Sequence, residues 1–236
     1  MADFDVIVVG SGMSGGWVAK EMSEKGFKVG VIERGRKIVP EKDYTDHLNP
    51  WDKPNLNKVS AEVKEDYPIQ STVYAFHGDT KQYWVKDKEH PYEVPDGQSF
   101  TWRRGYHEGG KSIMWGRQSY RMSEIDFEAN KKDGNGVDWP VRSADISKWY
   151  DYVETFAGIS GSTENLEILP DSVFQPPHDL TCAEIDFRDK VEKTFPGRRV
   201  IPGRVANLTA PTPEQTALGR GRCQARNLCY NGCSYG

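Results

Sequence analysis

Glycines close to the start of the chain form the pattern with the clearest chemical meaning. Gly10-Ser11-Gly12-Met13-Ser14-Gly15 has the spacing G-x-G-x-x-G, and Glu33 follows Gly15 by eighteen residues. Glycines at this spacing let backbone N–H groups approach a pyrophosphate, which then faces the positive end of the following helix. A carboxylate at the position of Glu33 accepts hydrogen bonds from a ribose diol. The pattern predicts a dinucleotide site whose contacts are Gly10, Gly12, Met13, Ser14, Gly15, Glu33 and Arg34.

The elements around this motif must hold it in place. Residues 4–9 are a β-branched run, which predicts a parallel strand buried on both faces. A helical pattern follows, with Gly26 placed to cap its C-terminus, and a second strand over 28–32 ends at Glu33. Gly10 is predicted to turn the chain sharply off the strand, and Gly15 to let the helix pack close to the sheet. The alternative is a strand–helix–strand turn with a purely structural role.

The identity of the dinucleotide is only partly determined by these residues. An acid at position 33 disfavours NADP, because it would repel the 2′-phosphate. Arg34 is the adjacent residue and weakens this exclusion. NAD and FAD are not separated by the motif.

A second glycine motif lies about one hundred residues further on. Gly109-Gly110-Lys111-Ser112-Ile113-Met114-Trp115-Gly116 combines two adjacent glycines with a hydroxyl and an aromatic residue, which suits the approach of backbone to a flat ring. The alternative is an ordinary turn with Trp115 as a core residue. His107 precedes the motif and is interpreted as a structural histidine.

The segment between the two motifs, residues 36–100, is rich in prolines and aromatics. It is interpreted as an insertion over a bound cofactor or as a surface loop system, with 82–86 and 92–94 paired as short strands. Beyond the second motif, the pattern predicts a helix from about Asp145 to Ala157, capped by Ser143 and ended by Gly158.

Three cysteines are concentrated near the end of the sequence. Cys223, Cys229 and Cys233 have the spacing C-x5-C-x3-C, and closely spaced thiolates are typical ligands of iron–sulfur clusters. Three ligands suit a three-iron cluster, whereas zinc usually takes a fourth. Structural or free thiols are the equal alternative, and a disulfide would leave one cysteine unmatched. Cys182 follows Thr181, which with Glu184 predicts a helix capping box, so Cys182 is assigned to packing.

Composition excludes several classes of protein. The chain has 236 residues and a formal net charge of −4, with no basic stripe, which argues against nucleic acid as a partner. No apolar run reaches the roughly 18 residues of a membrane span. The N-terminus lacks the basic region of a secretory signal, which predicts a cytoplasmic location.

Several motifs taken together resemble the glucose–methanol–choline (GMC) flavin oxidoreductases. The shared features are Ile32-Glu33-Arg34-Gly35 after the first motif, Gly109-Gly110-Lys111-Ser112 with Trp115, and Trp139-Pro140 before an aromatic helix. The match is closest to the pyranose oxidase-like and bacterial sugar dehydrogenase branch. The resemblance implies an α/β fold: a discontinuous Rossmann-type FAD-binding domain over 1–125, and the start of a substrate-binding α+β part over 126–236.

The resemblance also implies a function. The first motif would hold the FAD pyrophosphate, Glu33 the adenosine ribose, and Gly109, Gly110, Ser112, Met114, Trp115 and Gly116 would pass beside the isoalloxazine ring. The expected reaction oxidises a secondary alcohol of a sugar or glycoside, at C3 rather than C2, by hydride transfer to flavin N5. Met114 stands where pyranose 2-oxidases have a histidine bonded to the flavin, which predicts non-covalent FAD. Alternatives are an electron-transfer subunit with FAD and an iron–sulfur cluster, a cholesterol or alcohol oxidase-like enzyme, and an NAD-dependent dehydrogenase.

The expected partners follow from the same resemblance. Members of the family carry their catalytic histidine in a C-terminal part that this sequence does not match, so no catalytic residue is assigned. A missing C-terminal half or a partner subunit would supply it. The cysteine segment resembles loops that hold a 3Fe-4S cluster and pass electrons to a protein such as a cytochrome, although related oxidases have such loops without a cluster. A partner that carries a signal would permit a periplasmic location.

Overall fold

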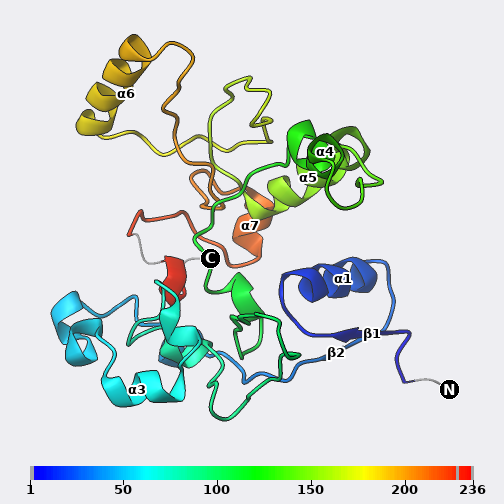
Figure 1. Ribbon diagram of the computed structural model, residues 1–236, viewed down its shortest axis with the longest axis vertical. Helices are drawn as coiled ribbons and strands as arrows, with labels where there is room; N and C mark the ends of the chain where they lie inside the picture. The colour runs from blue at the N-terminus through cyan, green and yellow to red at the C-terminus, as the bar shows by residue number, and fades with distance from the viewer. Residues whose placement is uncertain (1–2, 227–228, 235–236) are drawn as a thin grey trace. The chain divides into compact units, whose positions relative to one another are not determined.

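The computed structural model describes residues 3–226 and 229–234, which form two compact units (Figure 1). Of these residues, 3–116 and 229–234 belong to the first unit and 117–226 to the second. Among the described residues, the first unit combines strands, short helices and irregular segments, whereas the second combines helices with irregular segments. The division into domains at 1–125 and 126–236 stays a prediction about the whole protein.

The first unit begins with a strand, a helix and a second strand. β1 (Val6–Val9) and β2 (Val29–Ile32) are parallel, with Val6 opposite Val29 and Val9 opposite Ile32. α1 (Met13–Glu24) connects them and lies along the two strands in Figure 1. The helix ends as the sequence predicts, because Gly26 has a φ of 87° and donates its N–H to the carbonyl of Ser23.

The expected burial of β1 on both faces is wrong within this chain. Val8 is buried, but Ile7 is 52% exposed and Val9 is 82% exposed, and Ile32 at the end of β2 is also exposed. A single helix covers one face of two strands, and the residues that the structure describes place no layer on the other. The strands therefore have the composition of a fully covered parallel sheet while one apolar face remains open.

The remainder of the first unit is built from short elements. It contains α2 (Pro40–Asp43), α3 (Ala61–Asp66) and several single 3-10 turns, including Gly110–Ser112 and Cys229–Asn231. Their packing produces one apolar core, which consists of Ala75, Phe76, Tyr83, Trp84 and Met114.

The predicted pairing of 82–86 with 92–94 is wrong. Trp84 instead forms an antiparallel bridge with Gly105. Tyr92 turns toward a small aromatic group, where its hydroxyl donates to the carbonyl of Phe100 (3.0 Å) and accepts the N–H of Trp102 (2.8 Å). Side-chain hydrogen bonds of this kind hold 92–102 as a loop rather than as a strand.

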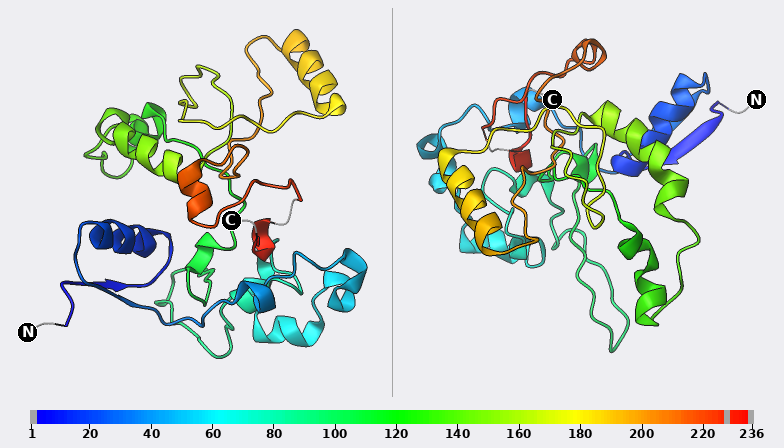
Figure 2. Two further views of the ribbon diagram at one scale, coloured as in Figure 1. Left: turned by 180° about the vertical axis from the view of Figure 1, so that it is seen from behind. Right: turned by 90° about the horizontal axis from the view of Figure 1, so that it is seen from above.

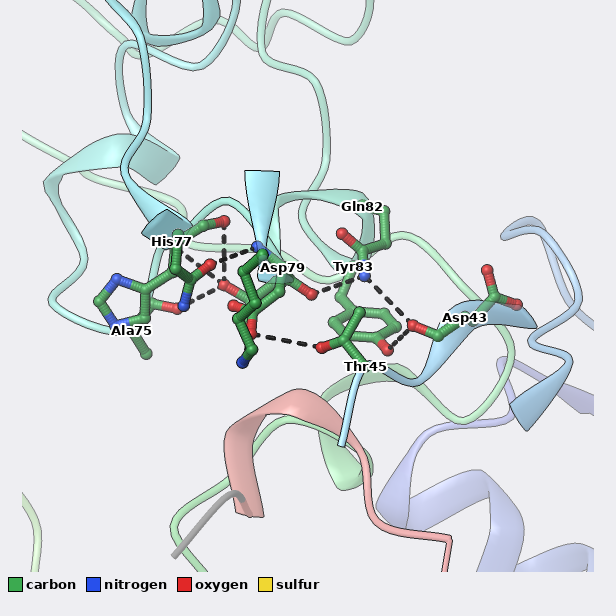
Figure 3. A network of polar contacts seen from close by, with 10 residues as sticks. Asp43, Thr45, Ala75, His77, Asp79, Gln82 and Tyr83 are labelled. Carbon is green, nitrogen blue, oxygen red and sulfur yellow. Dashed lines mark hydrogen bonds and ion pairs between the residues drawn. The ribbon is translucent and has the colours of Figure 1, made fainter. Parts of the chain in front are cut away.

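A buried polar network holds the segments around residues 43–57 and 75–83 together (Figure 3). Lys53 and Asp79 form an ion pair with both side chains almost fully buried, and the Thr45 hydroxyl also donates to Asp79 (3.3 Å). The Tyr83 hydroxyl and the Gln82 amide both donate to the carbonyl of Asp43. The ion pair compensates for burying two charges, and it fixes a region that has little regular structure.

The second unit contains four helices: α4 (Glu124–Asp133), α5 (Ser143–Ala157), α6 (Cys182–Thr194) and α7 (Pro213–Ala217). α5 ends at Gly158, with a φ of 75°, as predicted. The predicted cap is wrong, because Arg142 is the N-cap and the Ser143 hydroxyl donates to Glu124 of α4. A bidentate ion pair between Arg121 and Glu154, both largely buried, anchors α5.

α6 extends away from the other helices of its unit in Figures 1 and 2. Its predicted capping box is present, since the Thr181 hydroxyl accepts the N–H of Glu184 and the Glu184 carboxylate accepts the N–H of Thr181. The assignment of Cys182 to packing is wrong, because this cysteine is exposed at the start of the helix. Among the described residues, no helix has the length and apolar character to cross a bilayer.

Candidate functional site

The turn between β1 and α1 is shaped by its glycines. Gly10 adopts a φ of 90°, which favours glycine, and its N–H donates to the carbonyl of Ile32 (2.8 Å). A Cβ added to Gly15 would lie 1.9 Å from the oxygen of Gly10 and 3.2 Å from Val8 Cγ1. Only glycine at position 15 permits this close approach of helix and strand, as the motif predicts.

The start of α1 is open, and the helix has no acidic residue in its own first turn. A Cβ added to Gly12 would meet nothing within 4 Å, and the exposed residues Met13 and Ser14 follow it. No side chain caps this first turn. Its N–H groups and the helix dipole are therefore oriented toward the space where an anion such as a pyrophosphate would bind.

Glu33 lies at the end of β2 and is held by the turn. Its Oε2 accepts the N–H (2.9 Å) and the hydroxyl (2.6 Å) of Ser11, and its Oε1 accepts the N–H of Gly35 (2.7 Å). These hydrogen bonds, the Ser11 hydroxyl first and then the Gly35 N–H, lower the pKa of Glu33 to about 2. Glu33 is thus an ionised acceptor at neutral pH, which is the form that receives a hydroxyl donor.

The second glycine motif packs directly against the first. The N–H of Gly109 donates to the Ser11 hydroxyl (2.8 Å), and a Cβ added to Gly110 would lie 3.3 Å from the Cα of Gly12. The two motifs, far apart in the sequence, therefore meet within the first unit. Ser11 was not among the predicted site residues. Ser11 could have been predicted from its position between two glycines of the motif, because that position places both its N–H and its hydroxyl inside the turn.

The structure buries Met114 of the second motif and half-buries Ser112, Trp115 and Gly116. The Ser112 hydroxyl donates to the carbonyl of Gly109 (2.5 Å) and stabilises the turn. Met114 is buried in the apolar core, Trp115 is half-buried, and a Cβ added to Gly116 would lie 2.8 Å from the Tyr230 hydroxyl. Contacts of these residues with an isoalloxazine ring stay a prediction.

Arg34 and His107 lie near the site, and the contacts described for both are with other residues of the first unit. The guanidinium of Arg34 lies over the ring of Tyr106, with 4.9 Å to the ring centroid. His107 is 2% exposed; its Nδ1 lies 2.9 Å from the carbonyl of Glu108 and its Nε2 lies 3.5 Å from the sulfur of Met114. Burial lowers the pKa of His107 and favours the neutral ring, which agrees with its interpretation as a structural histidine.

The structure does not support the predicted metal ligands. Cys223 belongs to the second unit, whereas Cys229 begins a 3-10 turn of the first unit and Cys233 follows that turn. Within residues 3–226 and 229–234, no group of three His, Cys, Asp or Glu side chains is arranged to hold a metal ion. The three cysteines belong to two different units, so their role as a common set of ligands stays a prediction. All three cysteines are half-buried.

The fold and the site together define a class of protein. A parallel strand–helix–strand unit with a glycine turn, an open helix start and an ionised acid at the end of the second strand is a Rossmann-like dinucleotide-binding unit.

Comparisons with known proteins show which enzymes the chain is similar to. No family model matches the chain. It is 24% identical to the fructose dehydrogenase large subunit of Gluconobacter japonicus over 98% of the chain and 41% of that protein. It is 25% identical to the paromamine 6'-oxidase of Streptomyces fradiae over 99% of the chain and 36% of the relative. A cholesterol oxidase of Mycobacterium tuberculosis is 46% identical over 39 residues, 16% of the chain.

These relatives are GMC oxidoreductases, and the chain is similar to them at low identity and spans less than half of their length. The resemblance seen in the sequence motifs is thereby confirmed. GMC oxidoreductases are flavoproteins, which favours FAD over NAD as the dinucleotide.

Proposed function

We propose that this protein is part of an FAD-dependent oxidoreductase that oxidises a secondary alcohol of a sugar or glycoside. The observation that carries the proposal is the contact between the two glycine motifs, where Ser11 joins Gly109 to the ionised Glu33. The printed names of two relatives, a fructose dehydrogenase and a paromamine oxidase, support an alcohol substrate on a sugar.

The residues of the first unit fit FAD. The open start of α1 at Gly12 would hold the pyrophosphate, and Glu33 would accept a hydroxyl of the adenosine ribose. The ring would lie along the second motif, starting at Gly109 and Gly110. We propose a non-covalent cofactor, because the thioether of Met114 stands where the covalent histidine of pyranose 2-oxidases is found. The same difference favours oxidation at C3 over C2.

FAD supplies the acceptor for the hydride that leaves the carbinol carbon, at flavin N5. The hydroxyl proton of the substrate must leave at the same time, which requires a general base. His107 is buried and packed against Met114, so it is not that base. The role of this chain is to bind the cofactor and to fix the orientation of its two halves.

We propose that a further polypeptide segment completes the enzyme. The exposed apolar side chains of β1 and β2, Ile7, Val9 and Ile32 among them, require a cover, and the relatives are more than twice as long as this chain. The rest of the same protein or a partner subunit would provide the cover and the general base. The word "subunit" in the name of the fructose dehydrogenase relative supports a partner. An acceptor protein such as a cytochrome would then reoxidise the flavin, in the cytoplasm or, with a signal-bearing partner, in the periplasm.

The first experiment measures cofactor binding and is independent of turnover. The purified protein is titrated with FAD and, separately, with NAD, and binding is followed by flavin fluorescence and by calorimetry. We expect FAD to bind and NAD to bind at least tenfold more weakly. Tight binding of NAD without FAD would contradict the proposal and would support a nicotinamide-dependent dehydrogenase.

The second experiment tests the substrate. The flavin is reduced anaerobically with a panel of glycosides, a sterol and an aliphatic alcohol, in the presence of any protein that co-purifies, and the product ketone is located by NMR. Bleaching by glycosides with a ketone at C3 is expected. Bleaching by the sterol alone would support a cholesterol oxidase-like enzyme, for which the local similarity over 16% of the chain gives less support.

A further inference from the structure

The Ser11 hydroxyl contacts two segments of the first unit at once. It donates to Glu33 Oε2 (2.6 Å) and accepts the N–H of Gly109 (2.8 Å). The N–H of Ser11 donates to the same carboxylate oxygen (2.9 Å). One residue of the first glycine turn therefore contacts the acid at the end of β2 and the first glycine of the second motif.

The direction of these hydrogen bonds follows from the chemistry of the groups. An ionised carboxylate is an acceptor only, and a backbone N–H is a donor only, so the Ser11 hydrogen must point to Glu33 and an oxygen lone pair to Gly109. A bond to a charged acceptor is stronger than a neutral one, and it polarises the hydroxyl so that the oxygen becomes a better acceptor. The two contacts thus support each other.

The contacts join two parts with different expected roles. We call β1, α1 and Glu33 the adenosine side, and residues 109–112 the ring-side loop. Their close approach is visible in the 3.3 Å that would separate a Cβ on Gly110 from the Cα of Gly12. Ser112 closes the ring-side loop on itself, because its hydroxyl donates to the carbonyl of Gly109.

We propose that Ser11 is a positioning residue: its hydroxyl holds the ring-side loop in register with the adenosine side, so that one bound FAD meets both. The inference rests on the proposed function and deepens it, because it assigns a role to a residue outside the expected cofactor contacts. Ser11 acts through Gly109 and takes no part in the chemistry.

The substitution Ser11→Ala tests the adenosine side and the ring-side loop independently of each other. Glu33 would keep its bonds from the N–H groups of Ser11 and Gly35, whereas the Gly109 N–H would lose its acceptor. ADP, which would contact only the adenosine side, should bind within threefold of the wild type. FAD, which would need both sides, should bind about tenfold more weakly, as expected for the loss of one such bond.

Two further variants make the comparison specific. Ser11→Thr keeps the hydroxyl and should restore FAD binding to within threefold of the wild type. Ser23→Ala removes an exposed serine of α1 and should change neither affinity. Each protein is assayed for thermal unfolding and for its Kd for FAD and for ADP by calorimetry.

A measurement on the wild type keeps the inference testable if Ser11→Ala does not fold. Hydrogen exchange of the Gly109 amide should be slow in the absence of ligand, because the Ser11 hydroxyl is its acceptor. Rapid exchange of this amide in the wild type would overturn the inference, and faster exchange in Ser11→Ala would support it.

Different results would contradict the proposed function and the proposed role of Ser11. If the wild type binds neither FAD nor ADP, the proposed function is wrong. If the wild type binds both but Ser11→Ala weakens both equally, or leaves FAD unchanged, the role of Ser11 is wrong and the proposed function stands.

Discussion

Substitution of Gly15 by alanine should disrupt the first unit at its most tightly packed point. The added Cβ would lie 1.9 Å from the Gly10 oxygen, about 1.5 Å inside ordinary contact. This oxygen belongs to a backbone turn that is anchored by the hydrogen bond from Gly10 to Ile32, so it cannot swing aside as a flexible side chain would. Overpacking typically costs 1–3 kcal/mol, and we expect about 3 kcal/mol for Gly15→Ala because backbone must move.

The adjacent glycine provides a matched control. A Cβ on Gly16 would lie 3.8 Å from the carbonyl of Ser11, which is ordinary contact, and the position is exposed. Gly16→Ala should stabilise α1 by up to about 1 kcal/mol, because alanine has the higher helix propensity. The two variants differ by one position and are expected to change stability in opposite directions.

Thermal unfolding and urea titration measure both effects. For a chain of this size 1 kcal/mol corresponds to about 2–4 °C, so Gly15→Ala should lower the Tm by about 6–12 °C. Its affinity for ADP should fall at least tenfold, because the glycine turn is displaced. A Tm for Gly15→Ala within 2 °C of the wild type, or equal to that of Gly16→Ala, would refute the reasoning from close packing.

Three further changes test the charged groups of the structure. Because the pKa of Glu33 is about 2 in the folded protein and near 4.5 otherwise, its stabilising contribution is complete above pH 4.5 and is lost as the pH falls toward 2. The difference of about 2.5 between the two pKa values, at about 1.4 kcal/mol per pKa unit, sets an upper limit of roughly 3.5 kcal/mol, which solvent screening lowers because Glu33 is only partly buried; Glu33→Gln should flatten the acid side of the stability profile. Arg121→Leu should cost about 3–5 kcal/mol in urea titrations, because Glu154 would stay buried without its ion-pair partner. Lys53→Met should cost a similar amount through the buried Asp79.

Exposed partners of comparable charge serve as controls for the two ion pairs. Asp151→Asn removes the negative charge of an exposed ion-pair partner of Arg121, and Lys88→Met removes an exposed ion pair with Asp66. Each substitution should lower the free energy of unfolding by less than about 1 kcal/mol. If the buried and the exposed variants lose equal amounts of unfolding free energy, burial is not the reason why the two buried ion pairs matter for stability. A Glu33→Gln profile parallel to that of the wild type between pH 2 and 5 would contradict the lowered pKa.

Local features of the first unit could be predicted from neighbouring residues alone. β-branched runs define β1 and β2, Gly10 and Gly26 take the positive φ values that glycine tolerates, and Gly15 allows the close approach of α1. The Thr181 capping box belongs to the same group, because both of its partners lie within four residues. Such features depend on short-range sterics and hydrogen bonds, which the sequence contains completely.

The loop-rich segments could not be predicted in this way. Trp84 pairs with Gly105 rather than with the 92–94 segment, because side-chain hydrogen bonds of Tyr92 fix the intervening loop. The Ser143 hydroxyl bonds to α4 instead of capping its own helix. Each outcome depends on a partner that is distant in sequence, and periodicity carries no information about such partners.

The sequence by itself determined the dinucleotide motif, its strands and helix, and the resemblance to the GMC oxidoreductases. Only the tertiary structure decided that Gly109 meets Ser11, that Met114 is buried against His107, and that one apolar face of the sheet remains open. The three clustered cysteines stay a predicted ligand set, because spacing in the sequence does not by itself show that their side chains lie together. Adjacent residues determine short-range geometry, whereas burial and the pairing of distant groups depend on how the whole chain packs.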